Sequence, residues 1–464
     1  MKTENGVNTR GLVLDMLLEL ERGGEYGNLL LKNVLDKYDY LDGRDKAFIK
    51  RLTEGVLERR IQLDYVLGQF SKTPVNKCKP LIRCLLRMGA YQILFMDNIP
   101  DSAACNEAVK LAESRHFHQL KGFVNGVLRS ISRGKDTLAW PDREREAVRY
   151  FSVMYSMPEW IVRMWLADYG GKVTECMLQA LLEPRPVTIR LSQRISAQEK
   201  EALLTALEEC GAQPVVHPYL DYAYTLGKTE GIASLPGFEK GQFAVQDVSS
   251  MLVTECALAG RDSTQFLLDV CAAPGGKAVH AADRLYGSGR VQARDISGYK
   301  AGLIQENARR MGLENLEVCI WDATVPDESM KEKADVVLAD LPCSGLGVIG
   351  RKPDIKYRVT PESLQEVAAL QRRILANAAM YVKPGGRLIY STCTINKAEN
   401  EEQAAWFASR FPFTLHSLNG GLPEACQNAE TEAGMCQLLP GIHAADGFFI
   451  ACFVKNRGGN GEED

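Results

Sequence analysis

The chain has 464 residues, of which 45% are hydrophobic and 25% are charged, and its formal net charge is −4. This composition is typical of a globular protein of about two to four domains, and it excludes a disordered or a fibrous chain. No apolar run reaches the roughly 18 residues that a membrane-spanning helix needs, and the first residues lack the pattern of a signal peptide. We therefore expect a cytoplasmic protein that does not associate with membranes.

The charge distribution indicates what kind of partner the protein binds, and the spacing of the cysteines indicates whether it binds a metal. Residues 1–135 contain 22 Lys and Arg against 16 Asp and Glu, whereas the remainder contains 33 against 43. A basic first part indicates an anionic partner, with a chance fluctuation in charge as the alternative. The 13 cysteines include no Cys-x-x-Cys pair and no Cys/His cluster at zinc spacing, so we expect no metal site.

Residues 1–139 are expected to form an all-α domain. Apolar residues recur there at helical spacing, with no alternating strand pattern, and Gly and Pro residues separate the stretches. The stretches with helical spacing are 12–18, 47–70, 79–96, 102–112 and 122–131.

Residues 140–235 are expected to form a small α+β module. Helices are predicted at 158–169 and 199–210, the first of them with Pro at its start, which is a favoured position for proline. Strands are predicted at 187–191 and 222–226.

Residues 236–456 alternate between strands and helices, which predicts an α/β, Rossmann-like domain with a mostly parallel sheet. The tail, 457–464, is rich in Gly and acidic residues and is predicted to be disordered. The predicted strands are 266–270, 290–293, 316–320, 336–339, 388–391 and 448–453, and the predicted helices are 277–285, 298–311, 361–381 and 397–407.

The first of these strands leads into a loop of small residues. Such a loop lets the backbone approach a ligand, and the N-terminus of the next helix offers free N–H donors. The loop matches neither the P-loop nor the G-x-G-x-x-G pattern, so a nucleotide-like cofactor site and a tight structural turn both remain open. The candidate cofactor-binding residues of the loop are Cys271, Ala272, Ala273, Pro274, Gly275, Gly276 and Lys277.

Two acidic residues follow the next two strands. Asp295 ends the second strand, where an acidic residue typically accepts hydrogen bonds from a ribose. Asp322 follows the third strand, where a carboxylate can meet an adenine amino group, and helix capping is the alternative. Arg294 directly precedes Asp295 and is expected to place a cation near that carboxylate.

Two cysteines follow the fourth and fifth strands. The fourth strand ends at Asp340 and Cys343 follows it, and Cys393 follows the fifth. Because parallel strands end at the same edge of a sheet, we expect both thiols beside the cofactor loop. A cysteine there is a candidate nucleophile, although a buried apolar filler is the commoner role for any single cysteine. The residues alone do not say which thiol attacks.

The segments that carry these residues resemble the Sun-type RNA cytosine-5 methyltransferases. The resemblance rests on Asp340-Leu341-Pro342-Cys343-Ser344, on Ser391-Thr392-Cys393, on the loop 271–277, and on residues 241–250, 351–357 and 446–449. The family usually has Ala at the place of Leu341. Residues 106–109 and 121–129 resemble the NusB-like all-α RNA-binding fold. This pairing is similar to family members that act on 16S ribosomal RNA.

The resemblance implies an enzyme that uses S-adenosyl-L-methionine to methylate cytosine C5 in 16S ribosomal RNA through a covalent cysteine–C6 adduct. It implies that Cys393 is the nucleophile and that Cys343 assists product release. It also implies that the loop 271–277, Asp295, Asp322 and Asp340 bind the cofactor. We further expect Asp340 to be catalytic, by holding a protonated cytosine N3 in the transition state.

The expected partner is 16S ribosomal RNA, which the NusB-like domain, 1–139, and the extension, 140–235, are expected to bind. The target base has to leave its stack to reach the cysteines. Lys352 and Lys356 are expected to meet backbone phosphate, with a solvated loop face as the alternative. We expect a monomer.

Two alternatives remain open. The same chemistry on tRNA or 23S ribosomal RNA is the alternative within the class. A non-catalytic RNA-binding assembly factor that keeps the fold is the alternative outside it, and the intact cofactor loop and both cysteines argue against it.

Overall fold

The computed structural model describes residues 6–24, 26–227, 229 and 231–457. Of the tail predicted to be disordered, 457–464, all but Arg457 therefore lies outside the described residues. The chain divides into two compact units, here called the N-terminal unit (Met1–Glu183 with Ile349–Arg358) and the C-terminal unit (Pro184–Val348 with Val359–Asp464). The three-domain division expected from the sequence stays a prediction.

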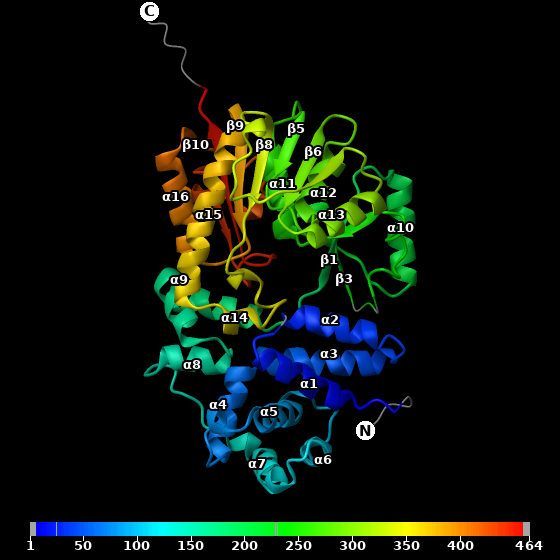
Figure 1. Ribbon diagram of the computed structural model, residues 1–464, viewed down its shortest axis with the longest axis vertical. Helices are drawn as coiled ribbons and strands as arrows, with labels where there is room; N and C mark the ends of the chain where they lie inside the picture. The colour runs from blue at the N-terminus through cyan, green and yellow to red at the C-terminus, as the bar shows by residue number, and fades with distance from the viewer. Residues whose placement is uncertain (1–5, 25, 228, 230, 458–464) are drawn as a thin grey trace, which may run out of the picture. The chain divides into compact units, whose positions relative to one another are not determined.

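The N-terminal unit is helical, as predicted, and Figure 1 labels its helices. Its core consists of buried apolar side chains from several helices, such as Leu14, Leu52, Leu85 and Leu128, each of which comes from a different helix. The helices before residue 139 are α1 (Thr9–Glu21), α2 (Gly27–Lys37), α3 (Gly43–Glu58), α4 (Arg60–Phe70), α5 (Pro80–Phe95), α6 (Asp101–Ser114) and α7 (Lys121–Gly134).

The stretch 47–70, predicted as one helix, is divided between α3 and α4 at Arg59. Arg59 has non-helical backbone angles, and the Ser156 hydroxyl accepts a hydrogen bond of 2.9 Å from the Ile61 amide in the first turn of α4. A hydroxyl acceptor satisfies one of the amides that a helix start leaves unpaired, so a distant serine stabilises this break.

Two further helices, α8 (Ala147–Met154) and α9 (Glu159–Ala180), follow. Gly170, whose φ is +73°, interrupts α9 directly after the predicted end of the first helix of the small module. A positive φ favours glycine because it has no Cβ, so the interruption falls at the residue type that adopts it most easily. None of the helices in the described part of the chain combines the length and the apolar character needed to cross a membrane.

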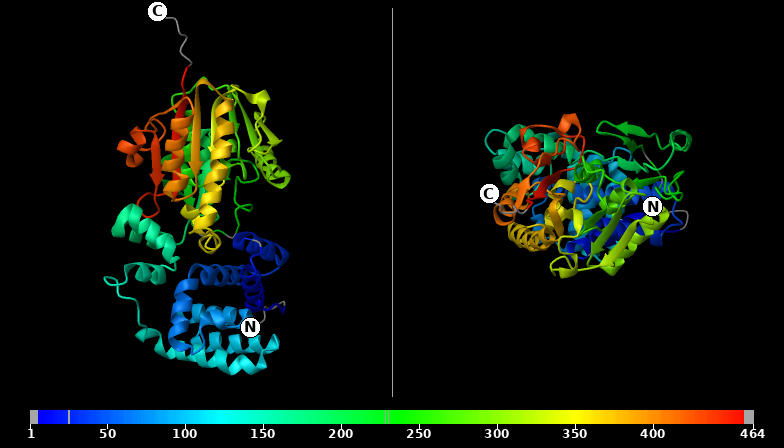
Figure 2. Two further views of the ribbon diagram at one scale, coloured as in Figure 1. Left: turned by 60° about the vertical axis from the view of Figure 1, so that its left-hand side comes forward. Right: turned by 90° about the horizontal axis from the view of Figure 1, so that it is seen from above.

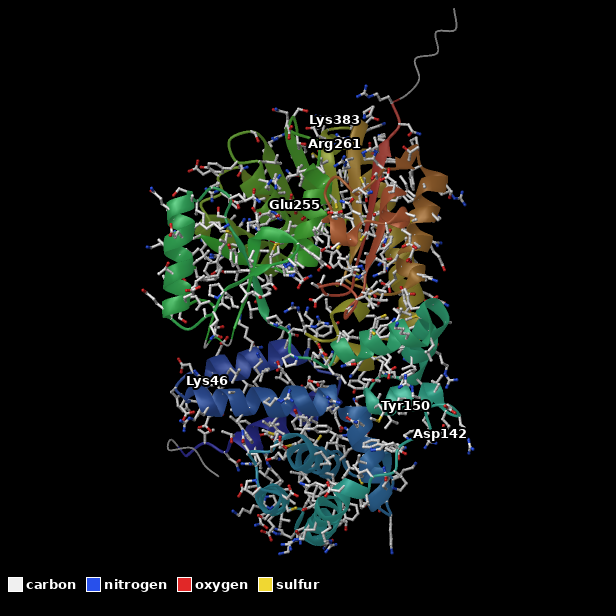
Figure 3. The ribbon with its side chains drawn as sticks, turned by 180° about the vertical axis from the view of Figure 1, so that it is seen from behind. Lys46, Asp142, Tyr150, Glu255, Arg261 and Lys383 are labelled. Atoms are coloured by element: carbon white, nitrogen blue, oxygen red, sulfur yellow. The ribbon has the colours of Figure 1, made fainter. Side chains whose placement is uncertain are left out.

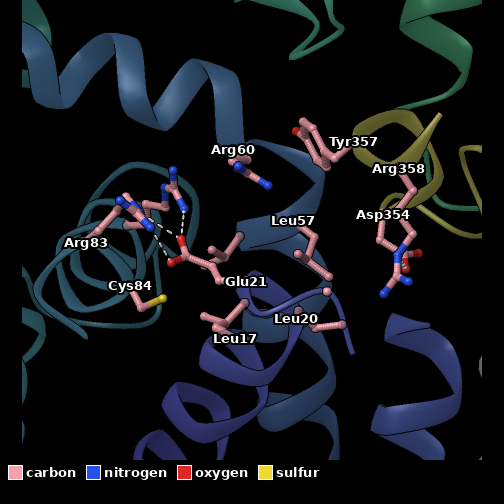
Figure 4. A pocket seen from close by; sticks show the side chains of 13 residues that line it. Leu17, Leu20, Glu21, Leu57, Arg60, Arg83, Cys84, Asp354, Tyr357 and Arg358 are labelled. Atoms are coloured by element: carbon pink, nitrogen blue, oxygen red, sulfur yellow. Dashed lines mark hydrogen bonds and ion pairs between the residues drawn. The ribbon is translucent and has the colours of Figure 1, made fainter. Parts of the chain in front are cut away.

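The segment Ile349–Arg358, which includes the short helix α14 (Ile355–Arg358), belongs to the N-terminal unit although it follows the Cys343 loop. The Asp354 carboxylate accepts from the Gly27 amide at 2.9 Å, and Arg358 donates to the Gly24 carbonyl at 3.0 Å. A cavity of about 300 Å³ lies within the N-terminal unit beside this segment (Figure 4). The polar and charged residues that line the cavity are Glu21, Arg60, Arg83, Arg87, Asp354, Tyr357 and Arg358.

Lys356 corrects an expectation from the sequence. Its side chain is 1% exposed, and its Nζ donates to the Glu58 carbonyl at 2.8 Å. Burial lowers the pKa of Lys356 to about 7. A buried ammonium that is held by a carbonyl of its own unit cannot meet a phosphate, so the expected RNA contact by Lys356 is wrong.

A four-stranded antiparallel sheet forms the small module of the C-terminal unit, in the order β2-β3-β1-β4. The helix α10 (Ala197–Glu209) packs on it through Leu203 and Leu207. Both strands predicted for this module are present. The strands are β1 (Val187–Leu191), β2 (Val215–His217), β3 (Leu220–Leu226) and β4 (Phe243–Val245).

The large sheet carries every strand predicted for residues 236–456. Its order is β10-β12-β9-β8-β5-β6-β7, with β11 (Met435–Leu438) paired to β12. The run β7-β6-β5-β8-β9 is parallel, and β12 is antiparallel to β9. The strands of this order are β5 (Phe266–Asp269), β6 (Arg290–Asp295), β7 (Leu316–Ile320), β8 (Ala334–Asp340), β9 (Val382–Thr392), β10 (Phe413–Leu415) and β12 (Phe448–Lys455).

Helices cover both faces of the large sheet (Figure 2). Leu267 packs in the core on the side of the helices α11 (Val248–Leu258), α12 (Gly276–Arg284) and α13 (Gly298–Arg310). Leu268, the next residue, packs against α15 (Pro361–Tyr381) and α16 (Glu401–Arg410). Successive residues of a strand point to opposite faces, so a sheet buried on both sides needs continuous apolar runs.

Candidate functional site

Figure 3 labels Arg261 and Lys383, which mark the amino edge of the parallel strands. Arg261 precedes β5 and Lys383 stands at the start of β9. The predicted site residues lie at the other, carboxyl edge, where β5, β6, β8 and β9 end. Ligands of open α/β sheets bind at that edge.

The loop 271–275 is a tight turn between β5 and α12. The Gly275 amide donates to the Ala272 carbonyl at 2.7 Å, and Gly275 has a φ of +106°. A Cβ on Gly275 would come within 3.2 Å of Ile304 on α13, so both the backbone angle and the close approach favour glycine here. The turn brings the amide-rich start of α12 to the edge of the sheet.

Asp295 holds this loop from the neighbouring strand. One of its carboxylate oxygens accepts from the Ala273 amide at 3.4 Å, and the other accepts from the Ser297 amide at 3.1 Å. The Ala272 amide also donates to the Arg294 carbonyl at 2.8 Å. The structure therefore brings Asp295 and the predicted cofactor loop together.

The Arg294 guanidinium lies away from Asp295, which corrects the expectation of a cation beside that carboxylate. It pairs with Asp327 at 2.8 Å and donates to Gln292 at 2.8 Å. Arg294 and Asp295 are consecutive residues of β6, so their side chains point to opposite faces.

Asp322, after β7, is partly exposed and accepts hydrogen bonds within its own turn. The Thr324 amide and hydroxyl donate to the same carboxylate oxygen at 2.8 and 2.7 Å, and these bonds lower the pKa of Asp322. Its other oxygen remains available as an acceptor. The assignment of Asp322 to the cofactor stays a prediction.

An ion pair joins α12 to the end of β8. The Lys277 ammonium lies 2.6 Å from the Asp340 carboxylate, whose other oxygen accepts from the Ser391 hydroxyl at 2.8 Å. Lys277 also lies 5.1 Å from the centre of the Phe448 ring, a cation–π contact. Lys277, which was expected to bind the cofactor as part of the loop, therefore forms an ion pair with Asp340.

Asp269 is a second buried carboxylate at this edge. One of its oxygens accepts from the Cys271 amide at 3.3 Å, and the other has no hydrogen-bond partner among the described residues. Burial, and then the nearby Asp340 carboxylate, raise the pKa of Asp269 to about 7. Sequence reasoning missed Asp269, although its place at the end of the first strand was a signal.

The two cysteines that follow β8 and β9 meet, with 3.3 Å between the Sγ atoms of Cys343 and Cys393. Both are free thiols, because a disulfide requires about 2.05 Å. Asp340 and Ser391 are register partners in adjacent parallel strands, which places the loops after them side by side. The hydrogen bond to Cys393, burial, and the Glu399 and Asp340 carboxylates raise the pKa of Cys343.

The motif at residues 446–449 closes the loop that follows Cys343. The Gly347 amide donates to the Cys393 carbonyl at 3.1 Å, and the Gly447 amide donates to the Gly347 carbonyl at 3.0 Å. A Cβ on Gly347 would lie 1.9 Å from the Gly447 oxygen. Two glycines are therefore needed where these backbones cross.

The site is built from carboxylates, one ammonium, two thiols and backbone amides. Within the described residues, no three His, Cys, Asp or Glu side chains form a group suited to a metal ion. The arrangement can hold a polar, cationic ligand beside two sulfur atoms.

Three family models match the chain. The one described as 16S rRNA methyltransferase RsmB/F matches residues 256–454, and the NusB family matches residues 7–133. The RsmF/B-like ferredoxin-like domain matches residues 157–232.

Relatives of known description match almost end to end. The probable ribosomal RNA small subunit methyltransferase B of Bacillus subtilis (strain 168) is 37% identical over 97% of this chain and 99% of its own. The ribosomal RNA small subunit methyltransferase B of Klebsiella pneumoniae (strain 342) is 31% identical over 98% of this chain and 100% of its own.

Solved structures confirm the predicted fold class. The crystal structure of PH0851 has a TM-score of 0.79 at 24% identity, covering 98% of this chain and 100% of that one. A methyltransferase homolog protein from Pyrococcus horikoshii has a TM-score of 0.56 at 25% identity, covering 67% of this chain and 99% of that one.

Proposed function

This chain belongs to the ribosomal RNA small subunit methyltransferase B family, and from that premise we propose that it methylates cytosine C5 in 16S ribosomal RNA. The methyl donor of the proposal is S-adenosyl-L-methionine, and the reaction passes through a covalent bond between Cys393 and cytosine C6. The observation that carries the proposal is the pair of thiols 3.3 Å apart beside the Lys277–Asp340 ion pair.

The residues at the sheet edge fit this cofactor. S-adenosyl-L-methionine carries a sulfonium and an ammonium, and the site offers the carboxylates of Asp269, Asp295 and Asp340 against the single ammonium of Lys277. One oxygen of Asp269 is buried without a partner among the described residues, which is the kind of acceptor that a bound cation would satisfy. The cofactor supplies an activated methyl group when it is bound.

Cys393 acts as the nucleophile in this proposal. Its thiolate forms a bond to C6, and the electron pair of the C5–C6 double bond makes C5 nucleophilic, so that C5 takes the methyl group as the bond between this group and the donor's sulfonium breaks and a neutral thioether leaves. The C5 proton then passes to water, the C5–C6 double bond re-forms, and the bond between C6 and Sγ breaks. Cysteine suits both steps because a thiolate is a good nucleophile and a good leaving group.

Cys343 assists the last step. Its hydrogen bond to Cys393 and its burial raise the pKa of the Cys343 thiol, and its sulfur lies 3.3 Å from that of Cys393, so Cys343 can donate a proton to the Cys393 sulfur as that sulfur leaves C6. Without this donor the covalent adduct is expected to persist.

Asp340 is proposed to hold a protonated cytosine N3. Lys277 and Ser391 each occupy one of its oxygens, and 26% of its side chain remains exposed. A carboxylate accepts about four hydrogen bonds, so Asp340 can still accept one from the base. The two bound partners orient the carboxylate before the base arrives.

The N-terminal unit supplies the RNA contacts in this proposal. Its first 135 residues carry an excess of six basic residues over acidic ones, and most of its sequence matches the NusB family. Phosphate contacts of this kind position RNA without reading its sequence.

The proposal is tested with the Cys343→Ala protein, S-adenosyl-L-methionine and a 16S ribosomal RNA fragment. An adduct that survives on a denaturing gel, and disappears when Cys393→Ala is added, supports both cysteine roles. Absence of an adduct while the wild-type protein transfers methyl to the same RNA contradicts the division of roles. The same assay with 23S ribosomal RNA and tRNA tests the substrate, and no transfer by the wild type to any RNA favours a non-catalytic assembly factor.

A further inference from the structure

A buried carboxylate that the mechanism above does not use lies behind the two cysteine loops. Glu399 ends the 3-10 turn Lys397–Glu399 and its side chain is fully buried. One oxygen accepts from the Ser344 hydroxyl at 2.5 Å and from Asn396 Nδ2 at 2.9 Å. The other accepts from the Ser344 amide at 2.8 Å and from Gln371 Nε2 at 3.3 Å.

These bonds connect Glu399 to both loops. Ser344 directly follows Cys343, and it presents both its amide and its hydroxyl to the carboxylate. The Ser344 hydroxyl also bonds the hydroxyl of Thr394, the residue after Cys393, at 2.6 Å. Glu399 therefore holds the turn that carries one thiol, and through Ser344 it reaches the turn that carries the other.

Gln371 of α15 also helps to hold the turn that carries Cys343. Its Nε2 donates both to Glu399 and to the Pro342 carbonyl, the latter at 2.9 Å. The Tyr390 hydroxyl donates to the backbone carbonyl of Glu399, and the same oxygen lies 3.3 Å from Gln371 Oε1. Residues on both sides of Cys343 are thus tied to one carboxylate.

All four donors to the Glu399 carboxylate are neutral, and none is a lysine or an arginine. Four donors converge on two oxygens, which a carboxylate satisfies fully. A glutamine would turn an NH₂ group toward two of those donors. The pattern therefore requires an acid at this position.

The charge of this acid acts on Cys343. After the hydrogen bond to Cys393 and burial, the Glu399 and Asp340 carboxylates contribute to the raised pKa of the Cys343 thiol. An anion close to a thiol disfavours the thiolate. Cys343 is accordingly held in the form that can donate a proton.

We propose that Glu399 is a positioning residue of the methyl transfer reaction, which fixes the Cys343 turn against the Cys393 turn so that Cys343 can act in release of the adduct. This inference rests on the proposed function, and it assigns a role to a residue that does not touch the substrate.

The first experiment needs no RNA. The pH dependence of Cys343 alkylation by iodoacetamide is followed by peptide mass spectrometry in wild-type, Glu399→Gln and Glu402→Gln proteins. Glu402 is exposed and three residues away, so it is the matched control. The alkylation midpoint of Cys343 is expected at lower pH in Glu399→Gln only. Coincident profiles in all three proteins overturn the electrostatic role.

The second experiment measures methyl transfer and adduct on 16S ribosomal RNA. Glu399→Gln is expected to lose about tenfold in turnover or more while retaining the adduct, because release is slowed. Full turnover in Glu399→Gln overturns the proposal. If Glu399→Gln does not fold, the same assay is made with Ser344→Ala, which removes the hydroxyl that joins the two turns. Full turnover in Ser344→Ala overturns the positioning role. If the wild-type protein transfers no methyl group, the proposed function is refuted. The alkylation experiment still tests the effect of Glu399 on Cys343 in that case.

Discussion

Lys277 Nζ donates to Asp340 Oδ2 at 2.6 Å, which fixes the first turn of α12 to the end of β8. The pair connects the loop expected to bind the cofactor with the carboxylate expected to hold the base. The effect of a change at Asp340 on turnover therefore has to be compared with its effect on cofactor binding.

Asp340→Asn is expected to lower turnover about 10–100-fold, as for a hydrogen bond to a charged group worth about 1.5–3 kcal/mol. Cofactor binding, measured by calorimetry, is expected to change far less. Asp262→Asn, an exposed change in the same unit, is the control and should leave both unchanged. Equal losses of turnover and cofactor binding would count against a role for Asp340 at the base.

Gly347→Ala is expected to destabilise the C-terminal unit by about 1–3 kcal/mol or more, as overpacking does. The new Cβ would lie 1.9 Å from the Gly447 oxygen, a backbone atom that cannot rotate away. Urea unfolding measures the effect. Gly302→Ala is the matched control, because a Cβ there meets nothing within 4 Å in α13, and it should stabilise by roughly 0.5–1 kcal/mol. Equal midpoints for the two variants would refute the crossing of the glycines.

Asp269 gives the C-terminal unit a stability that falls with rising pH. The pKa of Asp269 is about 7 in the folded protein, against 3.8 for an aspartate side chain in water, so between these values the folded state binds the extra proton. Raising the pH through this window therefore costs stability. Asp269→Asn is expected to flatten the dependence of the melting temperature on pH between about pH 4 and 7, the limits of this window. An unchanged slope in the variant would contradict a buried, protonated Asp269.

Lys356 has the opposite effect in the N-terminal unit. Its pKa is lowered to about 7 from 10.5, so between these values the unfolded state binds the extra proton. Stability contributed by Lys356 therefore rises with pH across this window. Lys356→Met is expected to remove that rise, measured by thermal unfolding from about pH 7 to 9. If both proteins gain stability equally over this range, another group is responsible.

The fold of the C-terminal unit was predictable because its strands are apolar on both faces. Runs such as 336–339 have no polar residue to interrupt them, and each predicted strand is present. The helix α2 was missed although it has an apolar stripe, in which Leu31 is buried and Leu30, Val34 and Leu35 pack against the core. Strands of three residues, such as β2 and β4, are too short to show an alternation.

At the site, the order of strands in the sequence predicted which residues meet at the ends of the strands, but it did not predict how the other side chains are oriented or buried. Cys343, Cys393 and Asp295 lie where their strands end. The orientation of Arg294, the burial of Lys356 and the four donors around Glu399 depend on which face or unit a side chain enters. The contact of Lys356 with Glu58 joins residues that are far apart along the chain, and no local pattern predicts it, whereas the alternation of side chains along a strand could have predicted the orientation of Arg294.

The membership of Ile349–Arg358 in the N-terminal unit means that the polypeptide passes between the two units three times. A protease cut at residue 183 gives two fragments that no peptide bond joins, but the hydrogen bonds of Asp354, Lys356 and Arg358 to the first 58 residues still connect them. A fragment that stops at residue 183 would in turn lack part of its own packing. A fragment designed to contain the whole N-terminal unit therefore has to include Ile349–Arg358 as well as Met1–Glu183.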